Sequence, residues 1–122
     1  MKTRIIAVVG ALALLSGCAA QVTEAGYYWG NYANTLYAYA KSPSDETLAQ
    51  HVTELREIIA ESKERGLKVP PGVLAELGYI EAQQGNNEAA LGHYEAEMQL
   101  YPESRVFLER LTAQNKERSS AP

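Results

Sequence analysis

The sequence is poor in the side chains that most often carry chemistry. It contains one cysteine, Cys18, and two histidines, His51 and His93. A single cysteine has no partner within the chain, which excludes an intramolecular disulfide. The histidines do not lie in a metal-ligand spacing such as HExxH, and no GxSxG motif or phosphate-binding glycine loop occurs. We therefore expect no catalytic residues, no metal and no cofactor, and we do not expect an enzyme.

Positive charge is also scarce. The sequence contains eleven Lys and Arg residues and fifteen Asp and Glu residues, which gives a net charge of −4. Binding of nucleic acid depends on neutralising phosphates with basic side chains, so we expect no nucleic-acid partner. A polybasic membrane-binding face is excluded for the same reason. The acidic excess is typical of a solvated surface, and no small-molecule substrate is indicated.

Long apolar runs are absent apart from one near the start, residues 5–15, which Gly10 interrupts. This run is about half of the roughly 20 residues that a helix needs to cross a bilayer. Two basic residues, Lys2 and Arg4, precede it, and small residues follow it. Together these features predict a secretory signal peptide rather than a membrane span.

The signal peptide ends in "LSGC", Leu15 to Cys18, which resembles a bacterial lipobox. The resemblance implies that diacylglycerol is attached to the Cys18 thiol and that the chain is cleaved between Gly17 and Cys18. Residues 1–17 would then be a cleaved lipoprotein signal peptide, and residues 18–26 a lipidated N-terminus and linker. A small buried cysteine that follows a signal peptide by chance is the alternative.

Several acyl chains, at about 0.8 kcal/mol per buried CH₂, would anchor such a protein permanently. Ala19 follows the cysteine. Lipoproteins of enteric-type bacteria carry Asp at that place when they stay in the inner membrane. The resemblance therefore implies the periplasmic face of the outer membrane, with the inner membrane as the alternative.

The rest of the chain has the periodicity of helices and sustains no strand alternation. We expect a helix from Ser42, as its N-cap, to Arg65, closed by Gly66 in the left-handed conformation. Its predicted core stripe comprises Leu48, Val52, Leu55 and Ile59.

Two further helices are expected before Pro102. One spans "GVLAELGYIEAQQGN", with the stripe Val73, Leu74, Leu77 and Ile80, and stops at Gly85. The other begins at Asn87, its predicted cap, and ends at Pro102, and its stripe comprises Leu91, Tyr94, Met98 and Tyr101.

A last helix is expected over residues 105–116. Its apolar residues are Phe107, Leu108 and Leu111. Residues 117–122 are expected to be a disordered tail. The predicted helical domain therefore spans residues 27–116.

The segment from Pro71 to Ser104 resembles a tetratricopeptide repeat and has the length of that repeat. The match rests on Leu74, Leu77-Gly78, Ala90, Tyr94 and Pro102, whereas Glu81 and Glu97 replace the usual Tyr and the second small residue. We expect an all-α fold, a short tetratricopeptide-repeat-like stack of antiparallel helix pairs with about five helices after the signal peptide. A plain helix bundle is the alternative.

Small side chains at the helix crossing of such a pair allow the two helices to approach each other closely. The first helix of the pair would line the inner, concave surface of the stack. Its candidate partner-binding residues are Ala75, Tyr79, Ala82 and Gln83.

Six aromatic residues crowd into positions 27–39, "YYWGNYANTLYAY". On a helix, the face formed by Trp29, Tyr32, Leu36 and Tyr39 would pack on the stripe of the next helix. Alternatively, the aromatics form a surface platform for a partner protein or glycan. Tyr27 and Tyr37 are the candidates for exposed partner-binding residues.

The aromatic stretch, the lipobox and the block "GVLAELGYIEAQQGNNEAAL" together resemble a family of small bacterial lipoproteins that is catalogued as domain of unknown function 4810. The resemblance implies a shared envelope complex with other envelope lipoproteins, one of them similar to the curli secretion channel. It supplies no activity and no catalytic residues.

We therefore expect a membrane-anchored periplasmic lipoprotein that acts as a protein–protein interaction or assembly module in a cell-envelope complex. The alternative is a peptidoglycan-associated factor or an activator of a cell-wall synthase.

Overall fold

The computed structural model describes residues 26–121, so the predicted signal peptide and Cys18 lie outside the described residues. Within this range the fold is all-α, as predicted, with five α-helices, one short 3₁₀ helix and no strand. The elements are α2 (Tyr32–Lys41), α3 (Asp45–Glu64), α4 (Val73–Gln83), α5 (Asn87–Leu100), η1 (Pro102–Ser104) and α6 (Arg105–Ser120).

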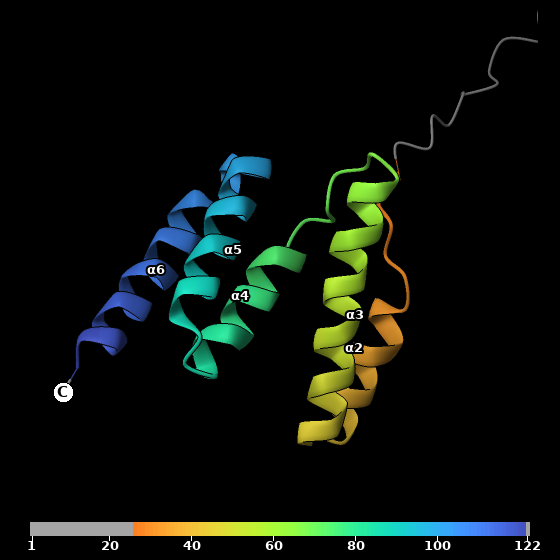
Figure 1. The fold of residues 1–122 in the computed structure, drawn as a ribbon, viewed down its shortest axis with the longest axis horizontal. Coiled ribbons are helices and arrows are strands. Elements are labelled where there is room, and N and C mark those ends of the chain that lie inside the picture. Colours follow the sequence, from red (N-terminus) through yellow and green to blue (C-terminus); the bar gives the residue numbers. More distant parts are fainter. Residues whose placement is uncertain (1–25, 122) are drawn as a thin grey trace, which may run out of the picture.

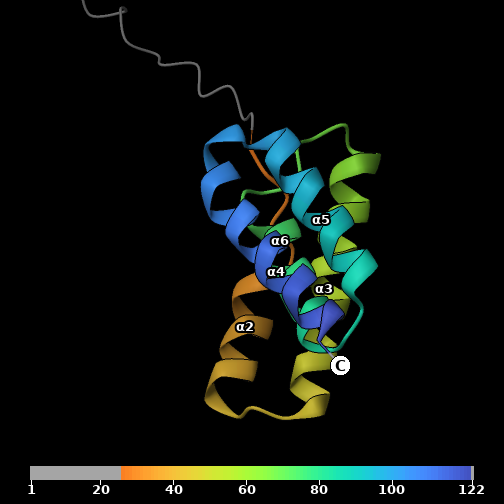
Figure 2. The same ribbon diagram turned by 90° about the vertical axis from the view of Figure 1, so that its left-hand side faces the viewer.

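The helices form a stack of antiparallel pairs. Successive helices run in alternating directions: α2 packs against α3, α4 against α5, and α6 against α5 (Figure 1). Seen along the stack, α2 and α6 lie on one side and α3 and α5 on the other (Figure 2). The predicted stack of helix pairs is confirmed, and α6, the last helix of the described residues, packs against α5.

The beginnings of two helices differ from the prediction by one or two residues. Ser44, not Ser42, caps α3: its Oγ accepts from the Thr47 N–H at 3.1 Å, and Thr47 Oγ1 accepts from the Ser44 N–H at 3.0 Å. This reciprocal capping box satisfies two N–H groups, whereas Ser42 contributes only a carbonyl oxygen to Thr47. The N-cap of α5 is Asn86 rather than Asn87.

The predicted ends of α3 and α4 are confirmed. Gly66 and Gly85 have φ values of +66° and +83°, which non-glycine residues rarely adopt. The Leu67 N–H donates to the Ser62 carbonyl at 2.8 Å, and the Asn86 N–H donates to the Glu81 carbonyl at 2.9 Å. These bonds close both helices with a left-handed glycine, which the sequence predicted for Gly66, whereas for Gly85 it predicted only the end of the helix.

The buried face of α3 is rotated relative to the predicted stripe. Of the stripe, only Leu55 is fully buried, while Leu48, Val52 and Ile59 lie at its margin. The buried residues are His51, Leu55, Ile58 and Ser62. The rotation follows from the burial of the polar His51. A prediction based on the spacing of apolar residues does not include a histidine in the buried face.

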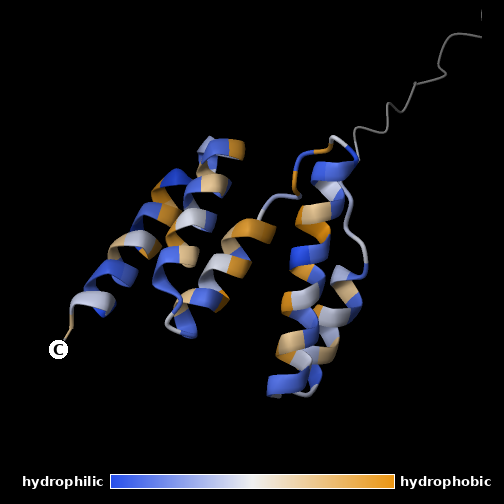
Figure 3. Cartoon of the chain, in the orientation of Figure 1, coloured by the Kyte–Doolittle hydropathy of each residue, from blue (hydrophilic) through white to orange (hydrophobic). Residues whose placement is uncertain are grey.

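Two core clusters hold the stack together. The first joins α3 to α4 and comprises Leu55, Ile58, Val73 and Leu77. The second joins α4, α5 and α6 and comprises Ala82, Ala90, Tyr94 and Leu108. Coloured by hydropathy, α4 carries several apolar residues, whereas α6 is mostly polar (Figure 3).

The predicted close crossing of α4 and α5 is present. A Cβ atom added at Gly78 would lie 2.9 Å from Tyr94 Cε1 and 3.0 Å from the Ala90 carbonyl oxygen. Ala90 and Tyr94 are both buried. Glycine at 78 therefore sets the distance between the two helices.

The last helix departs from the prediction in two ways. Leu108 is buried, but Phe107 is 60% exposed, because no element packs against that side of α6. The helix also continues to Ser120, so the predicted disordered tail is wrong for residues 117–120. No proline or glycine interrupts the helix before that point, and the hydroxyl groups of Ser119 and Ser120 donate to carbonyl oxygens of the last turns.

Candidate functional site

The aromatic segment is divided between core and surface. Tyr28 and Tyr32 pack against the first core cluster, which confirms the core interpretation for these two rings. Trp29 precedes α2 and stays partly exposed, with its ring 5.3 Å from that of Tyr32. Leu36 and Tyr39 face a groove that is described below.

A tight turn at Gly30 starts α2. Gly30 has φ +48°, and a Cβ atom there would collide with Glu54 Oε1 of α3. The same oxygen accepts a 2.6 Å hydrogen bond from the Asn31 N–H at the beginning of α2. Glu54 therefore complements the positive end of α2.

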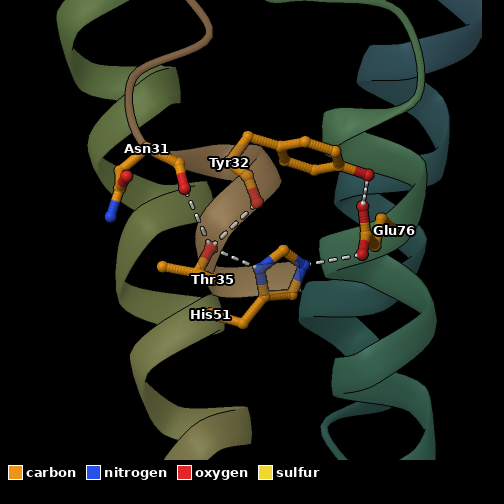
Figure 4. A network of polar contacts seen from close by, with 5 residues as sticks. All are labelled: Asn31, Tyr32, Thr35, His51 and Glu76. Atoms are coloured by element: carbon orange, nitrogen blue, oxygen red, sulfur yellow. Dashed lines mark hydrogen bonds and ion pairs between the residues drawn. The ribbon is translucent and has the colours of Figure 1, made fainter. Parts of the chain in front are cut away.

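A polar network connects α2, α3 and α4 (Figure 4). The Tyr32 hydroxyl donates to Glu76 Oε2 at 2.7 Å, and His51 Nε2 lies 2.8 Å from Glu76 Oε1. Because the carboxylate accepts, His51 Nε2 carries the hydrogen of this bond. Glu76 on α4 thus binds one residue from each of the two preceding helices.

Thr35 extends the network on the other side of the imidazole. Its Oγ1 lies 2.8 Å from His51 Nδ1 and 3.1 Å from the Tyr32 carbonyl oxygen. The order hydroxyl–imidazole–carboxylate resembles that of a catalytic relay. Here both imidazole nitrogens are already bonded, and the hydroxyl also contacts its own helix. The arrangement therefore joins three helices around a buried imidazole.

His51 is the residue that sequence reasoning placed wrongly. The predicted apolar stripe of this helix does not include His51, whereas only 1% of its surface is exposed. Burial is possible because Thr35 and Glu76 satisfy both ring nitrogens.

The same network changes the acidity of Tyr32. Burial, the hydrogen bond to Glu76 and the negative charge of that carboxylate raise the pKa of Tyr32 to about 12. The phenol is therefore a neutral hydrogen-bond donor over the whole physiological range.

A groove lies beside this network between α2, α3 and α4, with a volume of about 240 Å³. His51 and Glu76 contribute to its wall, and Tyr79, which is 50% exposed, lies along it with the exposed Gln83. The remaining lining residues are Leu36, Tyr39, Leu48, Ile80 and Gln84. The groove is thus mostly apolar, with amide groups and a tyrosine available to a ligand.

The other predicted partner-binding residues do not join Tyr79 and Gln83. Ala75 and Ala82 pack against the second core cluster, because α5 and α6 cover that side of α4, so their assignment to an open surface is wrong. Tyr37 is 65% exposed on another side of α2, where its ring lies 5.7 Å from Lys41 Nζ. Tyr27 is also partly exposed, and its ring contacts Trp29 edge-on.

Two buried carboxylates were missed by sequence reasoning. Glu81 is bonded to Arg56 at 2.8 Å and to His93 Nδ1 at 2.6 Å. Glu97 Oε1 accepts from the Gly72 N–H at 2.6 Å, at the N-cap of α4. The signal was present in the sequence, since Glu81 and Glu97 are the two departures from the repeat pattern.

The two histidines bind different glutamates and do not share a site. In residues 26–121 there is no group of three or more His, Cys, Asp or Glu side chains that could hold a metal ion. Within the same range no helix has the length and apolar character of a membrane span.

The fold and the groove define a small all-α protein, a stack of helix pairs with an apolar groove between its first three helices. A family model described as domain of unknown function (DUF4810) matches residues 27–111. The chain belongs to this family, which confirms the resemblance noted in the sequence. No curated protein and no solved structure matches the chain.

Proposed function

We propose that this protein is a docking module of the cell envelope, which binds a segment of a partner protein in the groove between α2, α3 and α4. The observation that carries the proposal is Tyr79, half-exposed beside an apolar groove. A partly exposed tyrosine offers a large contact area at low cost in conformational entropy, and such residues are enriched among the energetically dominant positions of interfaces.

The polar network supports this assignment. His51 and Glu76 satisfy each other and also bond to Thr35 and Tyr32. The groove wall is therefore fixed before a partner arrives, and a rigid site binds with a smaller loss of entropy.

The membrane part of the proposal rests on the sequence. The lipobox-like "LSGC" implies lipid on Cys18, and Ala19 implies the periplasmic face of the outer membrane. The partners proposed are other envelope lipoproteins, in keeping with the resemblance that the sequence carries.

Recovery of partners from detergent-solubilised membranes tests the proposal. We compare the unaltered protein with Tyr79→Ala and Gln83→Ala, and use Tyr37→Ala as the matched control, since it removes an exposed tyrosine of α2 outside the groove. Circular dichroism checks that each variant is folded. We expect a partner that is retained by Tyr37→Ala and lost from folded Tyr79→Ala.

Two outcomes would contradict docking in the groove. One is full recovery of every partner by folded Tyr79→Ala. The other is retention on purified sacculi that is independent of Tyr79, which would favour the peptidoglycan-associated alternative.

A further inference from the structure

A second hollow lies next to the groove, between α4 and α6. It is a crevice of about 10 Å³, roughly enough for a single water molecule. Tyr79 and Gln83 of α4 line both the groove and the crevice. A ligand that lies across Tyr79 therefore meets both hollows, and it touches the crevice only at its mouth.

The two hollows differ in chemistry. In the groove, the polar side chains of His51 and Glu76 are bonded to each other, and the side chains around them include Leu36, Leu48 and Ile80. Polar groups that are already satisfied give a ligand little to bond to. An apolar side chain is therefore the group that fits the groove.

The crevice instead offers hydrogen-bond donors and one positive charge. Its lining includes Gln83, Gln114 and Arg118, and no Asp or Glu is among its lining residues. Arg118 is exposed and belongs to none of the ion pairs found within residues 26–121. A guanidinium without a carboxylate partner, beside amide groups, is complementary to a negatively charged acceptor.

Arg118 and the buried Tyr94 both line this crevice. Burial and the neighbouring Tyr79 raise the pKa of Tyr94, whereas the positive charge of Arg118 acts in the opposite direction. The buried Asn115 Oδ1, which also belongs to the crevice lining, has no hydrogen-bond donor among the described residues. This acceptor is buried, so the group that the crevice presents to a ligand is the exposed guanidinium of Arg118.

We propose that the segment bound in the groove is an extended stretch of a partner protein in which an apolar side chain is followed by an acidic one. The apolar side chain fills the groove, and the acidic side chain crosses Tyr79 to pair with Arg118. This inference rests on the proposed function and adds the chemistry of the partner.

The spacing of the two side chains follows from the shared residues. In an extended chain, side chains two positions apart point to the same side and are about 7 Å from each other. Because only Tyr79 and Gln83 separate the hollows, we assign the acidic residue to the second position after the apolar one.

Synthetic peptides of eight residues test this assignment on the purified full-length protein. Each has Phe at position four and Glu, Gln or Lys at position six, in a Gly/Ser background. Binding is followed by fluorescence anisotropy, and amide NMR shifts of Gln83 and Gln114 locate it. We expect the Phe/Glu peptide to bind about two- to fivefold more tightly than the Phe/Gln peptide, the gain typical of an exposed ion pair.

A charge reversal makes the test specific. Arg118→Gln should abolish the preference for Glu, and Arg118→Glu should transfer the preference to the Lys peptide. Arg110→Gln, which removes an exposed arginine of α6 outside the crevice, should leave the preference unchanged.

Each remaining outcome decides against the inference. Equal binding of the Glu, Gln and Lys peptides, with shifts at Gln83, overturns the acidic preference and leaves the docking groove intact. A Glu preference that survives Arg118→Gln overturns the role of Arg118. If no peptide changes the amide NMR shifts of Gln83 and Gln114, recognition of an extended segment is overturned. The proposed function is judged separately, by the recovery of partners from membranes.

Discussion

His51 of α3 and Glu76 of α4 are 25 residues apart in sequence, and His51 Nε2 lies 2.8 Å from Glu76 Oε1. Tyr32 of α2 donates to the other oxygen of the same carboxylate. This relationship connects the first helix pair to the second at the wall of the groove. The shape of the proposed docking site therefore depends on a polar contact as well as on apolar packing.

We predict that His51→Leu lowers the free energy of unfolding by about 2 kcal/mol, because it removes a hydrogen bond to a charged group and leaves part of Glu76 unpaired. His51→Leu/Glu76→Leu should lose less than the sum of the single changes. Gln50→Leu, on the exposed side of α3, should change stability by less than about 0.5 kcal/mol. Urea denaturation measures the free energy of unfolding of each variant. If the two single changes add exactly in the double variant, His51 and Glu76 do not interact.

The crossing of α4 and α5 gives a second prediction. Gly78→Ala should destabilise the protein by about 1–3 kcal/mol, since its Cβ would meet the buried Tyr94 ring and the Ala90 carbonyl. Gly92→Ala is the matched control: Gly92 also lies within a helix, and a Cβ there meets nothing within 4 Å. It should be neutral or stabilising by up to about 1 kcal/mol. Thermal melts that give equal effects at both positions would show that the crossing is not close.

Stability at alkaline pH should depend on Tyr32. Its pKa is about 12 in the folded protein against 10.0 for an unperturbed tyrosine. Because the folded value is the higher one, the contribution of Tyr32 is complete below about pH 10 and is lost as the pH rises from about 10 to about 12. Unfolding by urea at pH 8 to 12 checks this. Tyr32→Phe should show a shallower decline than the unaltered protein, and identical declines would contradict the assignment.

Burial also raises the pKa values of Tyr94 and Tyr101, so the decline of the Tyr32→Phe variant should be reduced rather than abolished. Phenolate absorbance at alkaline pH provides an independent measurement of the same ionisations.

Lipid attachment is tested directly at Cys18. The only cysteine of the chain follows "LSG", so Cys18→Ala should leave an uncleaved or soluble precursor without lipid. Metabolic labelling with a palmitate analogue measures the result. Label on the Cys18→Ala protein would mean that the acyl group is carried elsewhere.

Helix termination was predictable because its causes are local. Gly66 takes the predicted left-handed conformation, α4 ends before Gly85 as predicted, and Pro102 follows the end of α5. The Gly78–Tyr94 crossing was also predictable, since the repeat pattern fixes both positions relative to each other. Each of these features depends on residues that are close in sequence or within one helix pair.

The groove could be predicted only in part. Tyr79 and Gln83 follow from their place on the first helix of the pair, but the burial of His51 depends on Thr35 and Glu76, which lie on other helices. A hydrophobicity pattern assigns polar residues to the surface. It therefore misplaces a histidine or a glutamate whose partners become neighbours only when the helices stack.

Site-specific photo-cross-linking tests docking in the groove most directly. A benzoylphenylalanine is placed at position 79, in the groove, or at position 37, which is also a tyrosine and is more exposed but lies outside the groove. Cells producing the full-length protein are then irradiated. The account predicts a discrete cross-linked partner from position 79 and none from position 37. A partner captured from position 37 and not from position 79, or equally from both, would contradict it.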